Sequence, residues 1–247
     1  MKIILVLLSF FCIQSLYGIP YKDCSSGISI SKGILEYWTK DKNYLVKEIS
    51  NLSCDETQYY LIKLYKVNNA LKKGQKENLQ LLNPEEMNKS IFASPNKMII
   101  NPKRSEKVFL NMPSGRKNKE LTFYKLYIIP VLPEAKYGFN NIEKEKNLQS
   151  KATVGMGAII GIIVEPENPD YTYNIQQINQ NKILSENKGN ALIFINCYGK
   201  KDKKYKSQTL KLYPNDKKYI DLTDYSEKVN CKIQLGNKYE NKMFTVN

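Results

Sequence analysis

The sequence predicts an all-β protein that folds into two β-sandwich domains. Segments rich in β-branched and aromatic residues recur along the chain, and turn-forming Asn, Pro, Gly and Ser separate them. The best helix candidate, residues 85–90, is too short to be stable alone. The length of 247 residues exceeds the usual size of one domain and suits two.

The first half contains a series of short strand-like segments. They are residues 44–50, 58–67, 97–100, 107–112 and 121–132. Many short strands with turns every ~8–12 residues are typical of a sandwich of the immunoglobulin type.

The second half repeats this pattern on a smaller scale. Its strand-like segments are residues 171–178, 182–185, 191–198, 206–213, 217–222, 230–235 and 239–246. About seven strands are what a second small sandwich needs.

The amino terminus has the features of a secretory signal peptide. A positively charged start precedes an apolar run at residues 3–13, and small and polar residues follow near Gly18. We expect residues 1–18 to be removed. The run is shorter than the ~20 apolar residues that span a bilayer. A lipid anchor on Cys12 is disfavoured because Phe11 stands where a lipoprotein signal has a small residue.

Four cysteines remain after this cleavage, and an even number in an exported chain predicts disulfides. Their spacing pairs Cys24 with Cys54 and Cys197 with Cys231, one bridge in each half. Each loop closure would stabilise the fold by roughly 3–4 kcal/mol. A metal site is disfavoured because the chain has no histidine and no closely spaced cysteine pair.

The formal net charge of +14 would ordinarily favour nucleic acid or an anionic membrane as a partner. Here the lysines are scattered among asparagine, isoleucine and tyrosine, a pattern that biased codon usage also produces. An exported protein meets little nucleic acid, so we expect no nucleic-acid partner.

Composition changes abruptly near the middle of the chain. Residues 133–152 are rich in lysine, glutamate and asparagine, which predicts a mobile loop. Residues 152–164, ATVGMGAIIGIIV, are the most apolar part of the mature chain and carry no charge. Two prolines within residues 165–169 then indicate a linker. We therefore predict a signal peptide at 1–18, a first domain at 19–165 and a second domain at 166–247.

The apolar segment has two different faces, because side chains of a strand alternate between its sides. The even positions carry Val154, Met156, Ala158, Ile160 and Ile162, whereas glycines occupy much of the odd side. Glycine weakens a strand and often marks the close approach of another backbone. A long, uncharged strand beside a mobile loop also lacks the usual protection against edge-to-edge pairing.

These features lead to a hypothesis of strand donation. If the even-numbered side chains enter a groove on a partner, Val154, Met156 and Ile160 would each contribute roughly 1.5–3 kcal/mol, and ladder hydrogen bonds would add to this. The alternative is an internal strand of the first sandwich, covered on both faces. The pattern taken alone favours that alternative.

Seven passages of the mature chain carry a resemblance to a known family. They are LVKEISN at 45–51, IFASPNKMIINP at 91–102, SEKVFL at 105–110, LTFYKLY at 121–127, AIIGIIVEP at 158–166, NKGNA at 187–191 and LYPND at 212–216. They resemble, in the same order, passages of the periplasmic chaperones of chaperone-usher pili. The similarity is greatest to the alternate branch that includes the common-pilus (Ecp) chaperones, and it runs over most of the mature chain.

This resemblance implies two immunoglobulin-like domains in an L-shaped, or boomerang, arrangement in the periplasm. The pilus (fimbrial) subunits that such chaperones hold lack their last strand, and the chaperone fills the open groove with its own apolar strand. An outer-membrane usher then exchanges that strand for the extension of the next subunit. The resemblance implies no cofactor and no small-molecule substrate, and it leaves self-association of the free form open.

The resemblance fails at one functional position. Well-known members clamp the terminal carboxylate of the subunit with two cations, one on the first strand and one on the donor strand. Gly161 stands at the second of these positions and cannot act. Lys32 is the candidate for the first cation, and Lys151 or Arg104 for the second. An ordinary solvated side chain is the competing interpretation of each.

Enzymatic functions are disfavoured, because a chain without histidine has no Ser-His or Cys-His pair. Two other binding functions compete with strand donation. A secreted adhesin or pilus structural subunit would also be all-β and disulfide-bonded, but it should carry a donor extension at its amino terminus. A eukaryotic surface protein with immunoglobulin-like domains would use Asn51 and Asn88 as glycosylation sites.

Overall fold

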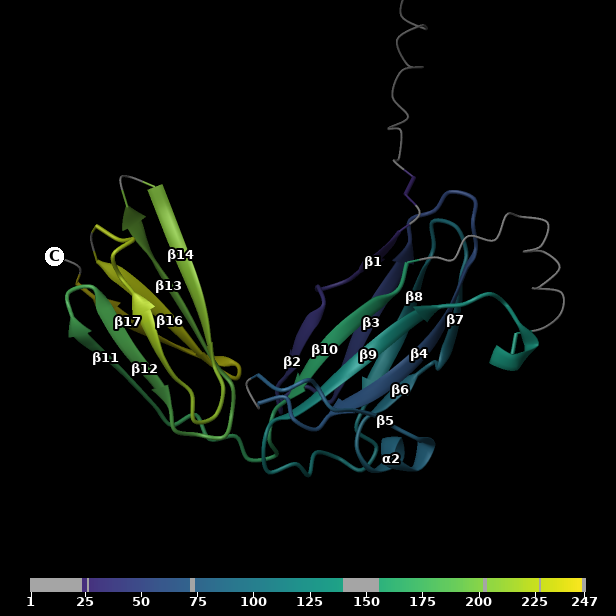
Figure 1. The fold of residues 1–247 in the computed structure, drawn as a ribbon, viewed down its shortest axis with the longest axis horizontal. Helices are drawn as coiled ribbons and strands as arrows, with labels where there is room; N and C mark the ends of the chain where they lie inside the picture. The colour runs from purple at the N-terminus through teal and green to yellow at the C-terminus, as the bar shows by residue number, and fades with distance from the viewer. Residues whose placement is uncertain are drawn as a thin grey trace, which may run out of the picture.

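The computed structural model describes residues 24–25, 27–71, 74–139, 156–201, 204–226 and 228–245. Its strands form four sheets, which are arranged as two lobes set at an angle (Figure 1). The predicted all-β fold with two sandwiches is confirmed. None of the described helices has the length and apolar composition needed to cross a membrane.

The first lobe contains two facing sheets. Sheet A has the strand order β1 (Ile28–Ile30), β3 (Tyr44–Asn51), β8 (Ser105–Asn111) and β6 (Phe92–Ser94). Sheet B has the order β2 (Leu35–Trp38), β10 (Ala158–Val164), β9 (Thr122–Pro130), β4 (Gln58–Val67) and β5 (Leu79–Leu81), and β7 (Lys97–Ile100) pairs with the start of β4. The helix α2 (Pro84–Lys89) and the 3-10 helix η1 (Ala135–Tyr137) lie between strands.

The described part of the second lobe contains seven strands, in agreement with the prediction of about seven. Sheet C has the order β11 (Tyr173–Asn179), β12 (Lys182–Asn187) and β15 (Lys217–Asp221). Sheet D has the order β14 (Lys204–Leu212), β13 (Ile193–Lys201), β16 (Val229–Leu235) and β17 (Lys238–Phe244).

Each lobe has its own apolar core, which follows from the alternation of side chains along the strands. In β3, Leu45, Lys47 and Ile49 point inward, whereas the residues between them are half-buried. In the second lobe, Ile195 and Ile233 point inward from neighbouring strands of sheet D. Lys47 is a buried charged residue at an inward position of β3, and the polar residues Asn51 of β3 and Ser185 of β12 are buried as well.

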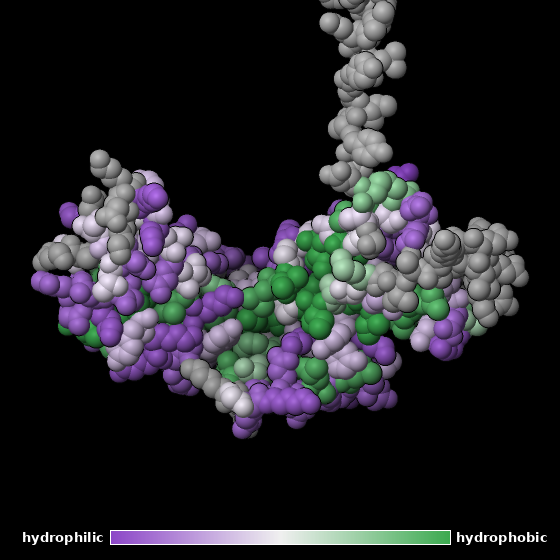
Figure 2. All heavy atoms as spheres, turned by 45° about the horizontal axis from the view of Figure 1, so that its top comes forward, coloured by the Kyte–Doolittle hydropathy of each residue, from purple (hydrophilic) through white to green (hydrophobic). Residues whose placement is uncertain are grey.

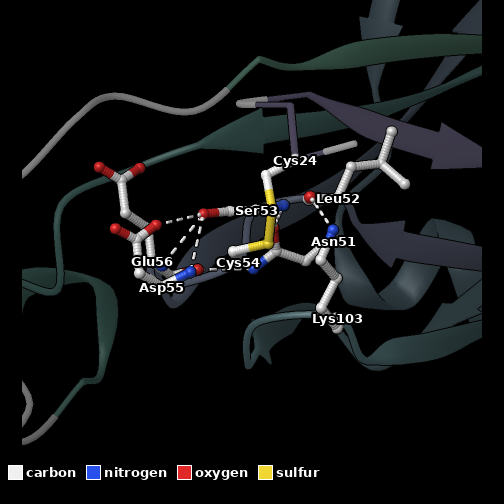
Figure 3. Close-up of a disulfide and its surroundings, with 8 residues drawn as sticks. All are labelled: Cys24, Asn51, Leu52, Ser53, Cys54, Asp55, Glu56 and Lys103. Atoms are coloured by element: carbon white, nitrogen blue, oxygen red, sulfur yellow. Dashed lines mark hydrogen bonds between the residues drawn. A yellow bond between two sulfur atoms is a disulfide. The ribbon is translucent and has the colours of Figure 1, made fainter. Parts of the chain in front are cut away.

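Both predicted disulfides are present. Cys24–Cys54 joins the segment before β1 to the loop after β3 (Figure 3), and Cys197–Cys231 joins directly opposite residues of β13 and β16. Near the first bridge, the buried Asn51 amide donates to the carbonyl oxygens of Glu56 at 2.7 Å and Ile100 at 3.0 Å. Asn51 is therefore closed to glycosylation in the folded chain, which contradicts its use as a glycan site.

Some sequence predictions lie outside the described residues. These are the signal peptide, most of the predicted mobile loop, Lys151 and Val154. The predicted helix at 85–90 corresponds to α2, which begins one residue earlier. Asn83 caps it, because its side chain accepts from the Glu86 backbone N–H at 2.9 Å while the Glu86 carboxylate accepts from the Asn83 N–H at 3.0 Å.

Candidate binding edge on β10

Strand β10 is paired on one side along its whole length and on the other side only in part. β9 pairs with it from Ala158 to Val164, whereas β2 pairs with it only from Gly161 to Val164. Among the described residues, the strand therefore has an open flank before Gly161. The flank lies on the side of the first lobe that faces the second lobe (Figure 1).

The backbone of Ile159 points toward this open flank. Gly161 donates its N–H to the Ile34 carbonyl oxygen at 2.8 Å, on the β2 side. Alternate residues of an inner strand bond to opposite neighbours, so the N–H and C=O of Ile159 face the same side as those of Gly161. No described residue pairs with them there. An edge with unpaired donors and acceptors is a template for another strand.

The even-numbered side chains of β10 change from buried to exposed toward its amino-terminal end. Ile160 and Ile162 are 0% and 1% exposed and belong to the core between sheets A and B, whereas Ala158 is half-buried and Met156 is 60% exposed. The prediction that Ile160 and Ile162 enter a groove on a partner is therefore wrong, because both fill the core of their own lobe. Only the start of this face is available to a partner.

The described glycines on the other face, Gly157 and Gly161, lie against atoms of this chain that leave no room for a larger side chain. A Cβ atom on Gly157 would lie 2.7 Å from the Ile128 carbonyl oxygen and 2.8 Å from Pro130 Cδ. One on Gly161 would lie 3.1 Å from Leu35 Cδ1. Gly157 thus leaves room for the backbone of β9, and Gly161 leaves room for the Leu35 side chain of β2.

The open flank is surrounded by exposed apolar side chains. Met156, Ile159, Ile34 and Leu35 are between 43% and 66% exposed. Hydrophobic residues gather between the two lobes, toward the first lobe (Figure 2). Exposed apolar patches of this kind mark interaction surfaces.

A buried ion pair holds the crossing segment, residues 31–34, which connects β1 of sheet A to β2 of sheet B. Lys47 is 1% exposed, and its ammonium donates to the carbonyl oxygens of Ser31 at 3.0 Å and Gly33 at 2.9 Å. It also pairs with Glu36 Oε1 at 2.5 Å. The crossing ends where β2 begins, at Leu35, so Lys47 sets the point at which the open flank is closed.

The structure does not bring the two described candidates for the carboxylate anchor, Lys32 and Arg104, together. Lys32 is exposed in the crossing segment, with a φ of 58°. The Arg104 carbonyl oxygen accepts from the N–H of Asn51, and Asn51 pairs with Ile28 at the start of β1. Arg104 therefore lies near the end of the first lobe where β1 begins. Lys151 lies outside the described residues. The assignment of these three residues stays a prediction.

Glu165 is the central polar residue between the lobes. It is fully buried, and its Oε1 accepts from the hydroxyls of Tyr37 at 2.9 Å and of Tyr171, while Oε2 accepts from the Lys40 N–H at 2.6 Å. Gly236 has a φ of +60°, and a Cβ there would lie 2.3 Å from the Tyr171 hydroxyl oxygen. The sequence indicated only a linker here, because Tyr37 and Lys40 are more than 120 residues away from Glu165 along the chain.

Apolar and aromatic contacts complete the junction. Leu121, Ile163 and Leu192 are buried together there. The Tyr37 ring meets the Phe194 ring edge-on, with 5.5 Å between their centroids. Tyr37 and Phe194 lie on the outer faces of sheets B and D, so these two faces meet at the base of the angle between the lobes.

The junction predicts a dependence of stability on alkaline pH. Burial, and then the neighbouring Glu165 carboxylate, raise the pKa values of Tyr37 and Tyr171 well above their usual range. Their stabilising effect is complete below the unfolded pKa of ~10 and is lost as pH rises above it. Urea unfolding should show a free energy that falls between about pH 9 and 11, and falls less steeply in Tyr37→Phe. Parallel curves would contradict this assignment.

No family model matches the sequence, and no curated protein matches it. Among the described residues, no group of three or more side chains is arranged to hold a metal ion. Solved structures do match over nearly the whole chain. The class 5 fimbriae chaperone CfaA is 18% identical, with a TM-score of 0.53, over 90% of this chain and 99% of that one. A chain from a chaperone–tip adhesin complex of CFA/I fimbriae biogenesis is 17% identical, with a TM-score of 0.50, over 89% of this chain and 98% of that one. The protein therefore has the two-domain fold that these chains share.

Proposed function

We propose that this protein is a periplasmic chaperone that holds pilus subunits by lending them β10 and passes them to an outer-membrane usher. The open flank of β10 before Gly161 carries this proposal. The likeness of the whole chain in fold to a fimbrial chaperone supports the proposal. The role is one of binding, without catalysis or a cofactor.

The two ends of the donor segment have different roles: one anchors the strand in its own lobe and the other contacts the client. Ile160 and Ile162 fix the strand in the core of its own lobe, so that its orientation is set before a client arrives. The backbone of Ile159 offers the client a donor and an acceptor. Met156 begins the side-chain face that enters the client, and its burial would contribute roughly 1.5–3 kcal/mol. We expect Val154 to continue this face.

A specific observation disfavours the alternative of an adhesin or pilus subunit. Such a subunit needs a free donor extension at its amino terminus. Here the first described strand, β1, pairs with β3, and the Cys24–Cys54 bridge ties the segment before it to the loop after β3. Strand β10, which carries the proposed donor flank, is internal in the sequence.

Substitution of Ile159 tests the role of the backbone. Ile159→Pro removes an N–H that no described residue of the chain uses, so the lobe should still fold, but a client strand cannot pair there. Ile159→Val keeps the N–H. After co-expression with the pilus subunits encoded beside its gene, we expect one-to-one complexes with the wild type and Ile159→Val, and at least tenfold less subunit with Ile159→Pro.

Two further measurements complete this test. Met156→Asp should also lose the subunit, because a carboxylate would enter an apolar groove. Circular dichroism of each purified variant must show an intact fold. Equal recovery of subunit by the wild type, Ile159→Pro and Met156→Asp would exclude donation by β10.

A further inference from the structure

The outer face of sheet D differs from the outer face of sheet C in its charge. Pairing of Ile195 and Cys197 with Ile233 and Cys231 defines the inner face, so the positions between them point outward. The outward residues include lysines, tyrosines and amides but no carboxylate. They are Phe194, Asn196, Tyr198, Lys200, Tyr205, Ser207, Thr209, Lys211, Asn230, Lys232, Gln234, Tyr239, Asn241 and Met243.

The outer face of sheet C provides a comparison within the same lobe. It carries both signs of charge, because Lys217 pairs with Glu186 at 2.8 Å and Lys182 lies opposite Asp221. On sheet D, by contrast, Lys200, Lys211 and Lys232 form no ion pair with any described residue. Their charges are available to a partner.

Aromatic rings are interleaved with these lysines. The Lys232 ammonium lies 3.9 Å from the centroid of the Tyr239 ring, and that of Lys200 lies 5.4 Å from the centroid of the Tyr205 ring. Tyr205 and Tyr239 are 79% and 53% exposed. Exposed tyrosines are enriched at protein interfaces, where the ring packs and the hydroxyl bonds.

This face begins at the junction with the first lobe. Phe194, at its near end, contacts Tyr37 of β2. Strands β2 and β10 lie on the side of the first lobe toward the second lobe, where β13 and β14 lie opposite them (Figure 1). A client strand added to the open flank of β10 therefore enters the space beside sheet D.

From this placement we infer that the outer face of sheet D is a second contact surface for the client subunit and binds its Asp and Glu side chains. The inference rests on the proposed function. Lysines without carboxylate partners at the rim of an interface steer an acidic partner and raise its rate of association. The apolar flank of β10 would then hold the client after the lysines have attracted it.

Charge reversal on the two sheets separates this inference from a general effect of net charge. Lys200→Glu/Lys232→Glu changes sheet D, and Lys182→Glu/Lys217→Glu makes the same change in net charge on sheet C. Lys182 also resembles Lys200 and Lys232 in its surroundings, because its ammonium lies 5.4 Å from the centroid of the Tyr219 ring. The measurement is the rate at which each full-length variant captures a denatured pilus subunit during refolding.

At ~20 mM salt we expect the sheet D variant to capture the subunit about tenfold more slowly than the wild type, and the sheet C variant to stay within about twofold. Near 1 M salt the difference should disappear, because the Debye length falls to ~3 Å. Equal slowing of both variants would overturn the inference. Binding of each variant to anionic lipid vesicles is measured as well. A sheet D variant that captures the subunit at the wild-type rate but no longer binds the vesicles would also overturn the inference.

A second measurement is independent of strand donation. Titration of the wild-type chain with a hexaglutamate peptide should shift the ring resonances of Tyr205 and Tyr239 in NMR spectra and leave those of Tyr219 unchanged. Shifts of equal size on both sheets, or on neither, would overturn the inference. If no variant and no wild type captures a subunit, donation by β10 fails, and the peptide titration still decides the role of sheet D.

Discussion

Replacing Ile160 with aspartate should unfold the first lobe, whereas the same replacement of Met156 should leave it folded. Ile160 lies on β10 and Met156 lies two residues before the strand begins, and Ile160 is 0% exposed whereas Met156 is 60% exposed. A carboxylate at position 160 would be buried without a partner, which costs more than about 4 kcal/mol and is a large part of the stability of a domain. At position 156 the change should stay within about 0.5 kcal/mol.

The single tryptophan of the chain makes this difference measurable. Trp38 is fully buried in the first lobe, so its fluorescence reports on that lobe alone. Urea titrations should show no folded baseline for Ile160→Asp and a transition close to that of the wild type for Met156→Asp. A cooperative, wild-type transition for Ile160→Asp would mean that the amino-terminal half of β10 is not part of the core.

The contrast between Ile160 and Met156 shows how far the sequence predicts the site. Alternation in residues 152–164 predicts which side chains share a face. It does not tell whether that face fills the core of its own lobe or the groove of a partner, because both environments select the same apolar residues. The answer depends on where β2 stops covering β10, which tertiary pairing decides.

The glycines of residues 152–164 correctly indicated the close approach of another backbone, but that backbone does not belong to a partner. Gly157 does mark a close backbone, as glycine in a strand often does. That backbone is β9 of the same lobe, at Ile128. A sequence pattern gives the need for space at a position, but it does not identify the strand that occupies the space.

The short edge strand β2 was not predicted from local sequence. It has four residues, too few to show a clear periodic pattern. It is a strand because β10 pairs with it. Glu165 was missed for a related reason, since its partner Tyr37 is 128 residues away in the chain.

The alternation of its own strand indicates that Lys47 is a polar residue of the core. In YLVKEIS it stands between the inward positions of Leu45 and Ile49, where a lysine is out of place unless a carboxylate meets it. Its partner Glu36 could not be identified in the sequence, because Glu36 lies on the other sheet of the sandwich.

Replacing Lys47 with methionine should therefore destabilise the first lobe by about 3–5 kcal/mol. The substitution leaves the Glu36 carboxylate, which is 12% exposed, without a counter-charge, and removal of one partner from a buried pair has a cost of this size. Urea titration of Trp38 fluorescence measures it. Lys125→Met is the matched control, because Lys125 and Glu77 are 25% and 51% exposed and such a pair contributes less than about 1 kcal/mol.

The double variant Lys47→Met/Glu36→Leu distinguishes the ion pair from the hydrogen bonds to the crossing segment. Removing both charges should restore most of the lost stability, since an apolar pair of similar volume often replaces a buried ion pair without loss. The carbonyl oxygens of Ser31 and Gly33 would still lack their donor. We therefore expect the double variant to be stable yet to capture a pilus subunit less well, because the crossing segment that ends the open flank is no longer fixed. Full stability together with capture at the wild-type level would show that Lys47 serves the core and not the flank.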